Sequence, residues 1–151
     1  MFLELEVSAV AWATFTIIVS QLICILIMWG LGLPPRKLVK EIEDVQNTAV
    51  GVVFFTISLT AAIFVSVLSS DGPTYSPPLE TLAWIVGGVV VGIIYVAILF
   101  MITHRIMGRQ PGENVYTYIR REVIKEQNAA LALFLGGLGA TPFIAIVYQI
   151  M

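Results

Sequence analysis

Four long stretches of the sequence carry almost no charge. They cover roughly residues 7–29, 45–68, 82–103 and 129–151. Each is about 22 residues long, and at about 1.5 Å of rise per residue a helix of this length crosses a hydrocarbon core about 30 Å thick. Only 12% of all residues are charged, and helices of soluble proteins rarely stay apolar on every side for so long. The sequence therefore predicts an all-α integral membrane protein with four transmembrane helices.

The basic residues are confined to two of the connecting segments. They are Arg36, Lys37 and Lys40 between spans one and two, and Arg105, Arg109, Arg120, Arg121 and Lys125 between spans three and four. Short loops rich in lysine and arginine stay in the cytoplasm. We therefore expect a multi-pass protein with both termini and the 69–80 loop outside the cytoplasm. The leader "MFLELEV" has no basic residue, so we expect the first span to be retained rather than cleaved as a signal peptide.

A short pattern occurs twice, at the start of spans two and four. "EIEDVQNTAVGV" begins at Glu41 and "EVIKEQNAALAL" begins 81 residues later, at Glu122. In both, a charged lead-in reaches a Gln-Asn pair just before the chain turns apolar. Since each half holds two spans, two copies would have the same orientation in the membrane. The pattern predicts two parallel two-helix repeats, at residues 1–70 and 71–151.

The charged lead-ins have helical patterns of their own. Tyr116, Ile119, Val123 and Gln127 recur at helical spacing, with basic residues on the other faces. We expect an amphipathic cytoplasmic helix here that continues into span four. Residues 37–46 predict a shorter version before span two.

These features together resemble a known family. A charged-helix lead-in, an N-[AT]-A start of an apolar helix and its repetition in a four-span chain are similar to the domain of unknown function 350 family of small bacterial inner-membrane proteins. The matched segments are "QNTAVGV" and "QNAALAL". The resemblance implies a location in the bacterial cytoplasmic (inner) membrane and this architecture. It implies no reaction.

The repeated asparagines suggest where the spans pack. An amide facing acyl chains would be left without a hydrogen-bond partner, so each asparagine is expected to turn inward. Small residues follow on the same helical face and let helices approach closely. Spans two and four should then pack together, with the asparagines bonded to each other or to carbonyls of the facing helix; alternatively, the amides only reach headgroup water. The predicted helix-packing residues are Asn47, Gly51, Ser58, Asn128, Ala132, Gly136, Gly139 and Pro142.

Pro142 has a further expected effect, because it lies in the middle of the fourth span. Proline removes one backbone donor and pushes on the carbonyl four residues earlier, that of Leu138. Three glycines just before it add pliability. We expect a kink or local distortion over residues 138–142.

Catalytic chemistry finds little support in the sequence. None of the four span cores holds an Asp, Glu, Lys or Arg, which proton or ion coupling usually requires. The chain has one histidine and one cysteine, far apart, so it offers no metal-ligand cluster of its own. We interpret Cys24 as a packing residue and His104 as an interfacial histidine, with a haem or metal ligand as its alternative role. We expect no enzyme activity, cofactor or bound metal.

Two functions remain, from different classes. The first is a non-enzymatic membrane protein that oligomerises or serves as an accessory subunit of a larger membrane complex. The second is a small homo-oligomeric channel or transporter whose pore is lined by Ser, Thr, Asn and Gln. Expected partners are membrane lipids and either further copies or another membrane subunit. Nucleic acid is not expected, since glutamates balance the basic segments. The candidate pore residues are Thr56, Ser58, Thr60, Ser66 and Thr141.

Overall fold

Four long helices dominate the computed structural model, which describes residues 2–69, 78–107 and 110–150. All regular secondary structure within those ranges is helical. All four are long and apolar enough to cross a membrane, which confirms the predicted number of spans. The helices are α1 (Phe2–Gly30), α3 (Thr48–Leu68), α4 (Pro78–Ile106) and α6 (Ala129–Ile150).

Short helices form the two connecting segments. The first is α2 (Pro35–Glu43), which starts with a proline because the first helical position needs no N–H donor. The second is α5 (Val115–Arg120), which continues into the π-helix η1 (Arg121–Lys125). The predicted continuous helix into span four is not present. The chain turns sharply at Gln127, whose φ is 53°, and α6 begins two residues later.

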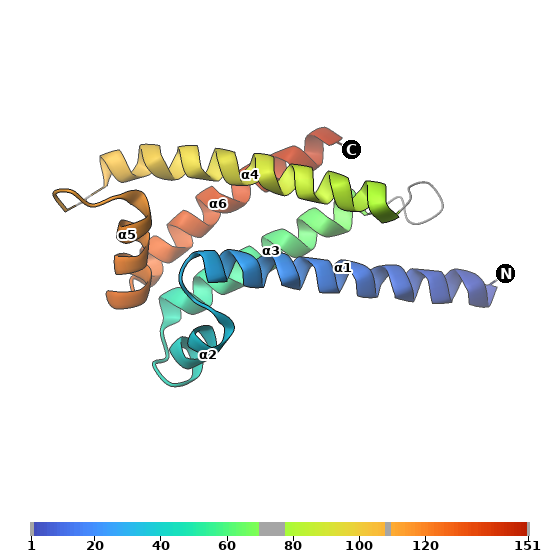
Figure 1. The fold of residues 1–151 in the computed structure, drawn as a ribbon, viewed down its shortest axis with the longest axis horizontal. Coiled ribbons are helices and arrows are strands. Elements are labelled where there is room, and N and C mark those ends of the chain that lie inside the picture. Colours follow the sequence, from blue (N-terminus) through green and yellow to red (C-terminus); the bar gives the residue numbers. More distant parts are fainter. Residues whose placement is uncertain (1, 70–77, 108–109, 151) are drawn as a thin grey trace.

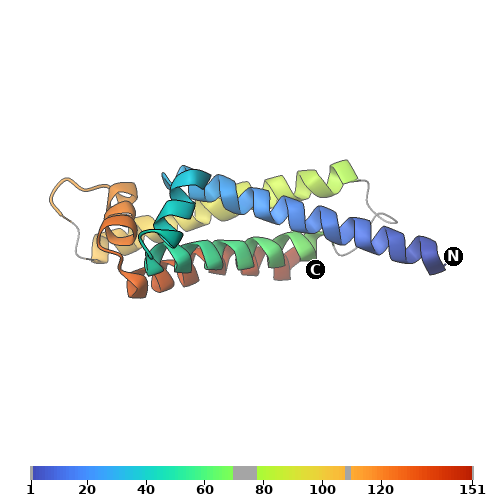
Figure 2. The ribbon, with the colours of Figure 1, turned by 90° about the horizontal axis from the view of Figure 1, so that it is seen from below.

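The long helices form two layers. Helices α3 and α6 pack along each other, α1 packs on α3, and α4 packs on α6. Figure 2 shows α3 and α6 in one layer, with α1 and α4 in the other. Helices α2 and α5 lie at one end of the molecule, hereafter the connector end, and both chain termini lie toward the other end (Figure 1). The expected packing of spans two and four is therefore confirmed.

Aromatic rings on glycines join α4 to the central pair. A Cβ at Gly88 would lie 2.5 Å from the ring of Phe64 on α3, and a Cβ at Gly92 would lie 2.5 Å from the ring of Phe143 on α6. The two rings meet edge to face, with centroids 5.4 Å apart. Glycines four residues apart on α4 thus leave room for a pair of phenylalanines.

A second core region lies nearer the connector end. Cys24 and Met28 of α1 are fully buried there with Val50 of α3 and Ala132 of α6. Cys24 is thus a packing residue, as expected. Many apolar side chains on the outer faces stay exposed, for example Ile94 and Leu133. Such outward apolar faces suit helices whose surroundings are acyl chains.

Candidate functional site: polar junctions at the connector end

The first junction joins α2 to α3 through Glu41 and Asn47. Asn47 caps α3, because its Oδ1 accepts from the backbone N–H of Val50 at 3.2 Å. Its Nδ2 donates to Glu41 Oε2 at 3.2 Å, and its backbone N–H donates to the carbonyl of Glu41 at 2.9 Å. Gln46 makes the turn in the left-handed region, with a φ of 55°.

The second junction has the same construction, 81 residues later. Asn128 Oδ1 accepts from the backbone N–H of Leu131 at 3.0 Å, and its Nδ2 donates to Glu122 Oε2 at 3.0 Å. The backbone N–H of Asn128 donates to the carbonyl of Glu122 at 2.9 Å. Gln127 takes the positive φ of Gln46. The paired amides thus end one helix and start the next at a sharp turn.

The two asparagines differ in what they bind across the molecule. Asn47 Nδ2 also lies 3.2 Å from the carbonyl oxygens of Val123 and Ile124 in η1. Asn47 is therefore 2% exposed and links the first half of the chain to the second. The bonds of Asn128 stay within its own half, and the two asparagines do not bond each other. Asn47 thus reaches carbonyls of η1, which precedes α6, rather than carbonyls of the facing span itself.

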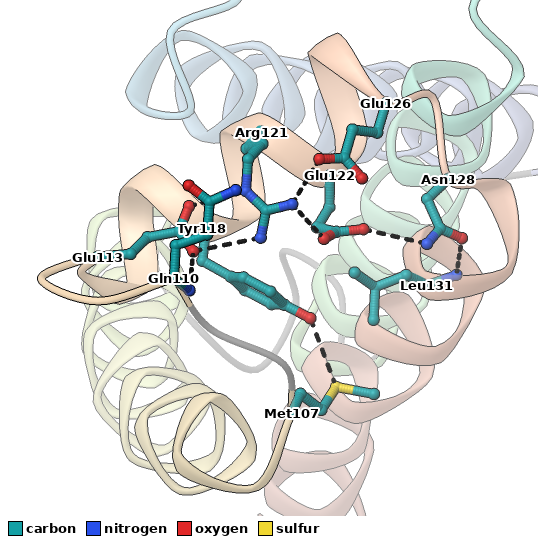
Figure 3. A network of polar contacts seen from close by, with 9 residues as sticks. All are labelled: Met107, Gln110, Glu113, Tyr118, Arg121, Glu122, Glu126, Asn128 and Leu131. Carbon is teal, nitrogen blue, oxygen red and sulfur yellow. Dashed lines mark hydrogen bonds and ion pairs between the residues drawn. The ribbon is translucent and has the colours of Figure 1, made fainter.

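An ionic cluster centred on Arg121 holds the second connector together. Its Nε lies 2.9 Å from Glu113 Oε1, and its Nη1 lies 2.8 Å from Glu122 Oε1 and 2.5 Å from Glu126 Oε1. Figure 3 shows the guanidinium between the three carboxylates, with Glu122 reaching Asn128 on its other side. The cluster holds two negative charges in excess. Its carboxylates are engaged in binding the arginine and the asparagine cap.

The pKa shifts within the cluster follow from these bonds. Hydrogen bonds from Arg121 lower the pKa of Glu113, and the bonds to Glu113 and Glu126 raise the pKa of Arg121. Burial, aided by the charge of Glu122, raises the pKa of Tyr118. The Tyr118 hydroxyl therefore stays protonated and donates to the sulfur of Met107, 3.8 Å away. All these groups lie outside the four apolar spans.

His104 is buried rather than open to its surroundings. Its side chain is 6% exposed, and its ring meets the Tyr118 ring edge-on with centroids 5.3 Å apart. The expectation of a histidine tip in the headgroups does not match this packing. Its Nε2 has no hydrogen-bond partner among the residues that the structure describes. Within the same residues, no group of three or more His, Cys, Asp or Glu could hold a metal ion.

The predicted packing residues of α3 point in different directions. Gly51 faces open space, since a Cβ there would meet nothing within 4 Å. Ser58 accepts a hydrogen bond from Gln21 Nε2 of α1 at 3.0 Å, so it lies on the α1 side. The contact with α6 is made instead by Thr56, two residues earlier. The supposed small-residue stripe along α3 is therefore not a single interface.

Two of the predicted residues of α6, Ala132 and Gly136, lie at the seam between α3 and α6. Ala132 is fully buried, and a Cβ at Gly136 would lie 2.9 Å from Thr56 Oγ1. Gly139 faces α4, where its Cβ would lie 3.7 Å from the ring of Phe100. Pro142 is buried, and α6 runs unbroken from Ala129 to Ile150 around it. The helix is thus not interrupted at Pro142, and the kink expected over residues 138–142 stays a prediction.

The polar groups at the connector end make joints between helices. Glu41 and Glu122 bind asparagine caps, and Arg121 binds the carboxylates around it. Sequence reasoning placed Asn47 and Asn128 at the starts of the two spans but did not predict that they cap them. It also missed the cluster, because Arg121 and Glu126 are five residues apart and meet only in a π turn. Comparisons with protein-family models, with curated proteins and with solved structures found no match for this chain.

Proposed function

We propose that the protein is a non-enzymatic polytopic membrane protein that oligomerises or serves as an accessory subunit of a larger membrane complex. The observation that carries this proposal is how its polar groups are used. At the connector end they bind one another and fix helix ends, with Asn47 bridging the two halves. Side chains committed to such joints favour a structural role over turnover of a substrate.

An open apolar face offers the surface for a membrane partner. On α3 it presents Phe55, Leu59 and Ile63, and on α6 it presents Thr141 and Tyr148, all exposed. Both helices belong to the same layer (Figure 2). A second copy or another membrane subunit would cover it, with lipids around the remaining helices.

The proposed orientation places the connector end in the cytoplasm of a bacterial cell. In the sequence, all eight basic residues fall between spans one and two or between spans three and four, which supports this orientation. Both termini would then lie outside the cytoplasmic membrane. Alkaline phosphatase fused after Met151 is expected to be active in a bacterial host. Fluorescence of green fluorescent protein at the same position would contradict this topology.

The proposed architecture has two parallel two-helix repeats, residues 1–70 and 71–151. Its support is that Glu41, Gln46 and Asn47 reproduce the bonds and backbone angles of Glu122, Gln127 and Asn128. The packing of α1 on α3 also has its counterpart in that of α4 on α6. The resemblance to the domain of unknown function 350 family agrees with this architecture and this membrane.

Native mass spectrometry of the protein extracted with its lipids tests the proposed role. A complex with a different subunit, or a homo-oligomer that passes no ions after reconstitution, is the expected result. A closed ring of identical chains that conducts ions would favour the channel or transporter instead. Recovery only as a single chain, at native expression levels, would contradict both.

A further inference from the structure

Two neighbouring arginines have opposite surroundings. Arg121 binds three carboxylates, whereas no acceptor for Arg120 is found among the described residues. The Nε of Arg120 is buried and has no hydrogen-bond partner there. A partly buried guanidinium without a counter-charge is costly, because it has lost water without gaining an anion. Arg120 therefore has unused capacity to bind an anion.

The guanidinium of Arg120 contacts an aromatic ring and the loop between α1 and α2. Its Cζ lies 5.4 Å from the centroid of the Tyr116 ring, a cation–π contact. On Gly32, in the loop between α1 and α2, a Cβ would lie 3.0 Å from Cζ and Nε and 3.1 Å from Nη2. Gly32 has a φ of +84°, so glycine is needed both for the turn and for this approach. The arginine is thus oriented before any ligand arrives, which favours binding.

Further positive charge follows that loop, in the first turn of α2. The first turn of α2 contains Arg36 and Lys37, four and five residues after Gly32, and no acidic residue. No side chain caps this helix start, so the partial positive charge of its N–H groups adds to theirs. Ion pairs among the described residues involve Arg121, not these three cations.

The position along the membrane normal indicates which anion is available. Gly32 lies two residues beyond the end of α1, and Trp29, in the last turn of that helix, is 60% exposed. Exposed tryptophans at span ends mark the headgroup level of the bilayer. The fork of an arginine matches the two free oxygens of a phosphodiester. We propose that Arg120, supported by Arg36 and Lys37, binds the phosphate of an anionic phospholipid in the leaflet at the connector end.

Lipid titration of the full chain tests this site. Purified protein in detergent is mixed with dioleoyl phosphatidylglycerol or dioleoyl phosphatidylcholine, and native mass spectrometry measures the fraction with one bound lipid. The wild type should prefer phosphatidylglycerol. Arg120→Gln should lower the affinity for the first phosphatidylglycerol about tenfold. Arg120→Lys should lower it less, since lysine keeps the charge but loses the two parallel N–H donors of the guanidinium. The matched control is Arg105→Gln, which removes an exposed arginine from α4 at the connector end. It should leave the binding of phosphatidylglycerol unchanged.

Other outcomes would overturn the assignment. If Arg120→Gln and Arg105→Gln weaken phosphatidylglycerol binding equally, the lipid is attracted to basic residues in general. If the wild type binds both lipids equally, the site has no preference for an anionic lipid. Displacement of the lipid by millimolar inorganic phosphate would identify free phosphate as the ligand. If Arg120→Gln does not fold, the site can be tested with Arg120 in place. The double variant Trp12→Phe, Trp84→Phe keeps Trp29 as the only tryptophan, whose fluorescence then reports lipid bound nearby. Brominated phosphatidylglycerol should then quench Trp29 more than brominated phosphatidylcholine, and equal quenching would refute the site.

Discussion

At the scale of single residues, Asn47 and Asn128 show how identical motifs acquire different weight. Both cap an apolar helix and bind a glutamate six residues earlier. Only Asn47 donates further to carbonyls of η1, and only Asn47 is almost fully buried. Removing a buried amide leaves its hydrogen-bond partners buried and unpaired. The free energy lost is then larger than the net contribution of the hydrogen bond.

Replacement of Asn47 should therefore destabilise the protein more than replacement of Asn128. Asn47→Ala loses the helix cap and the bonds to η1, about 2–3 kcal/mol together, whereas Asn128→Ala loses about 1 kcal/mol with its cap. A thiol-reactive dye reports thermal unfolding, since Cys24 is the only cysteine and is fully buried. Equal drops in the unfolding temperature of the two variants would show that the bonds to η1 contribute nothing.

Glu113 should make stability depend on acid pH. Its hydrogen bonds with Arg121 lower its pKa in the folded state. The folded state therefore gains stability above the unfolded pKa of about 4.3, and that gain is lost as the pH falls through the lowered folded value. Glu113→Gln should unfold at a lower temperature than the wild type at pH 7, and the difference should shrink toward pH 3, as measured by circular dichroism. Glu43→Gln, which replaces an exposed carboxylate on α2, is the matched control for the loss of one negative charge.

At the scale of elements, the joints depend on backbone geometry that side-chain periodicity does not report. In both connectors an N–H donates to a carbonyl five residues earlier, from Val45 to Lys40 and from Glu126 to Arg121. Helical spacing places residues three or four apart on one face, so it could not predict that Arg121 meets Glu126. The Gln-Asn pairs were visible in the sequence, but two non-glycine residues at positive φ were not.

The contact between α3 and α6 can be tested with two adjacent glycines. A Cβ at Gly136 would meet the side chain of Thr56 at 2.9 Å, while Gly137 has nothing within 4 Å. Thr56 cannot move away freely, because its hydroxyl donates to the carbonyl of Val52 at 2.8 Å. Gly136→Ala should destabilise by about 1–3 kcal/mol, and Gly137→Ala should be neutral or mildly stabilising. Adding Thr56→Ala should rescue Gly136→Ala, and its failure would place the strain elsewhere.

At the scale of the whole molecule, the number and extent of the spans could be predicted because they follow from length and hydropathy alone. The packing of α3 on α6 could be inferred from the repeated asparagines, although the faces assigned to Gly51 and Ser58 could not. Helices that are apolar all round have no amphipathic stripe to indicate direction, so the sequence cannot say which side meets a neighbour. Ring-on-glycine contacts such as Phe64 on Gly88 settle that choice.

The seam between α3 and α6 brings two positions on different helices close enough for a disulfide. In a Cys24→Ala background, cysteines replacing Thr56 and Gly136 should form a disulfide within one chain, because the two Cβ positions lie 3.2 Å apart, close to the usual separation of about 3.8 Å. The control pair, at Ser58 and Gly137, should not, since Ser58 faces α1 while Gly137 faces outward. Absence of the first crosslink, or an equal yield of the second, would contradict the packing of α3 on α6.

The same series addresses the proposed assembly through one additional variant. A single cysteine at Gly137 lies where no other described residue would touch it, so within one chain it has no partner. If copies meet through the open face of α3 and α6, oxidation in native membranes should give a crosslinked dimer from Gly137→Cys. A single cysteine at Ser58, turned toward α1, should stay monomeric. If native mass spectrometry shows oligomers but Gly137→Cys forms no crosslinked dimer, the copies do not meet through α3 and α6. The interface would then lie on α1 or α4.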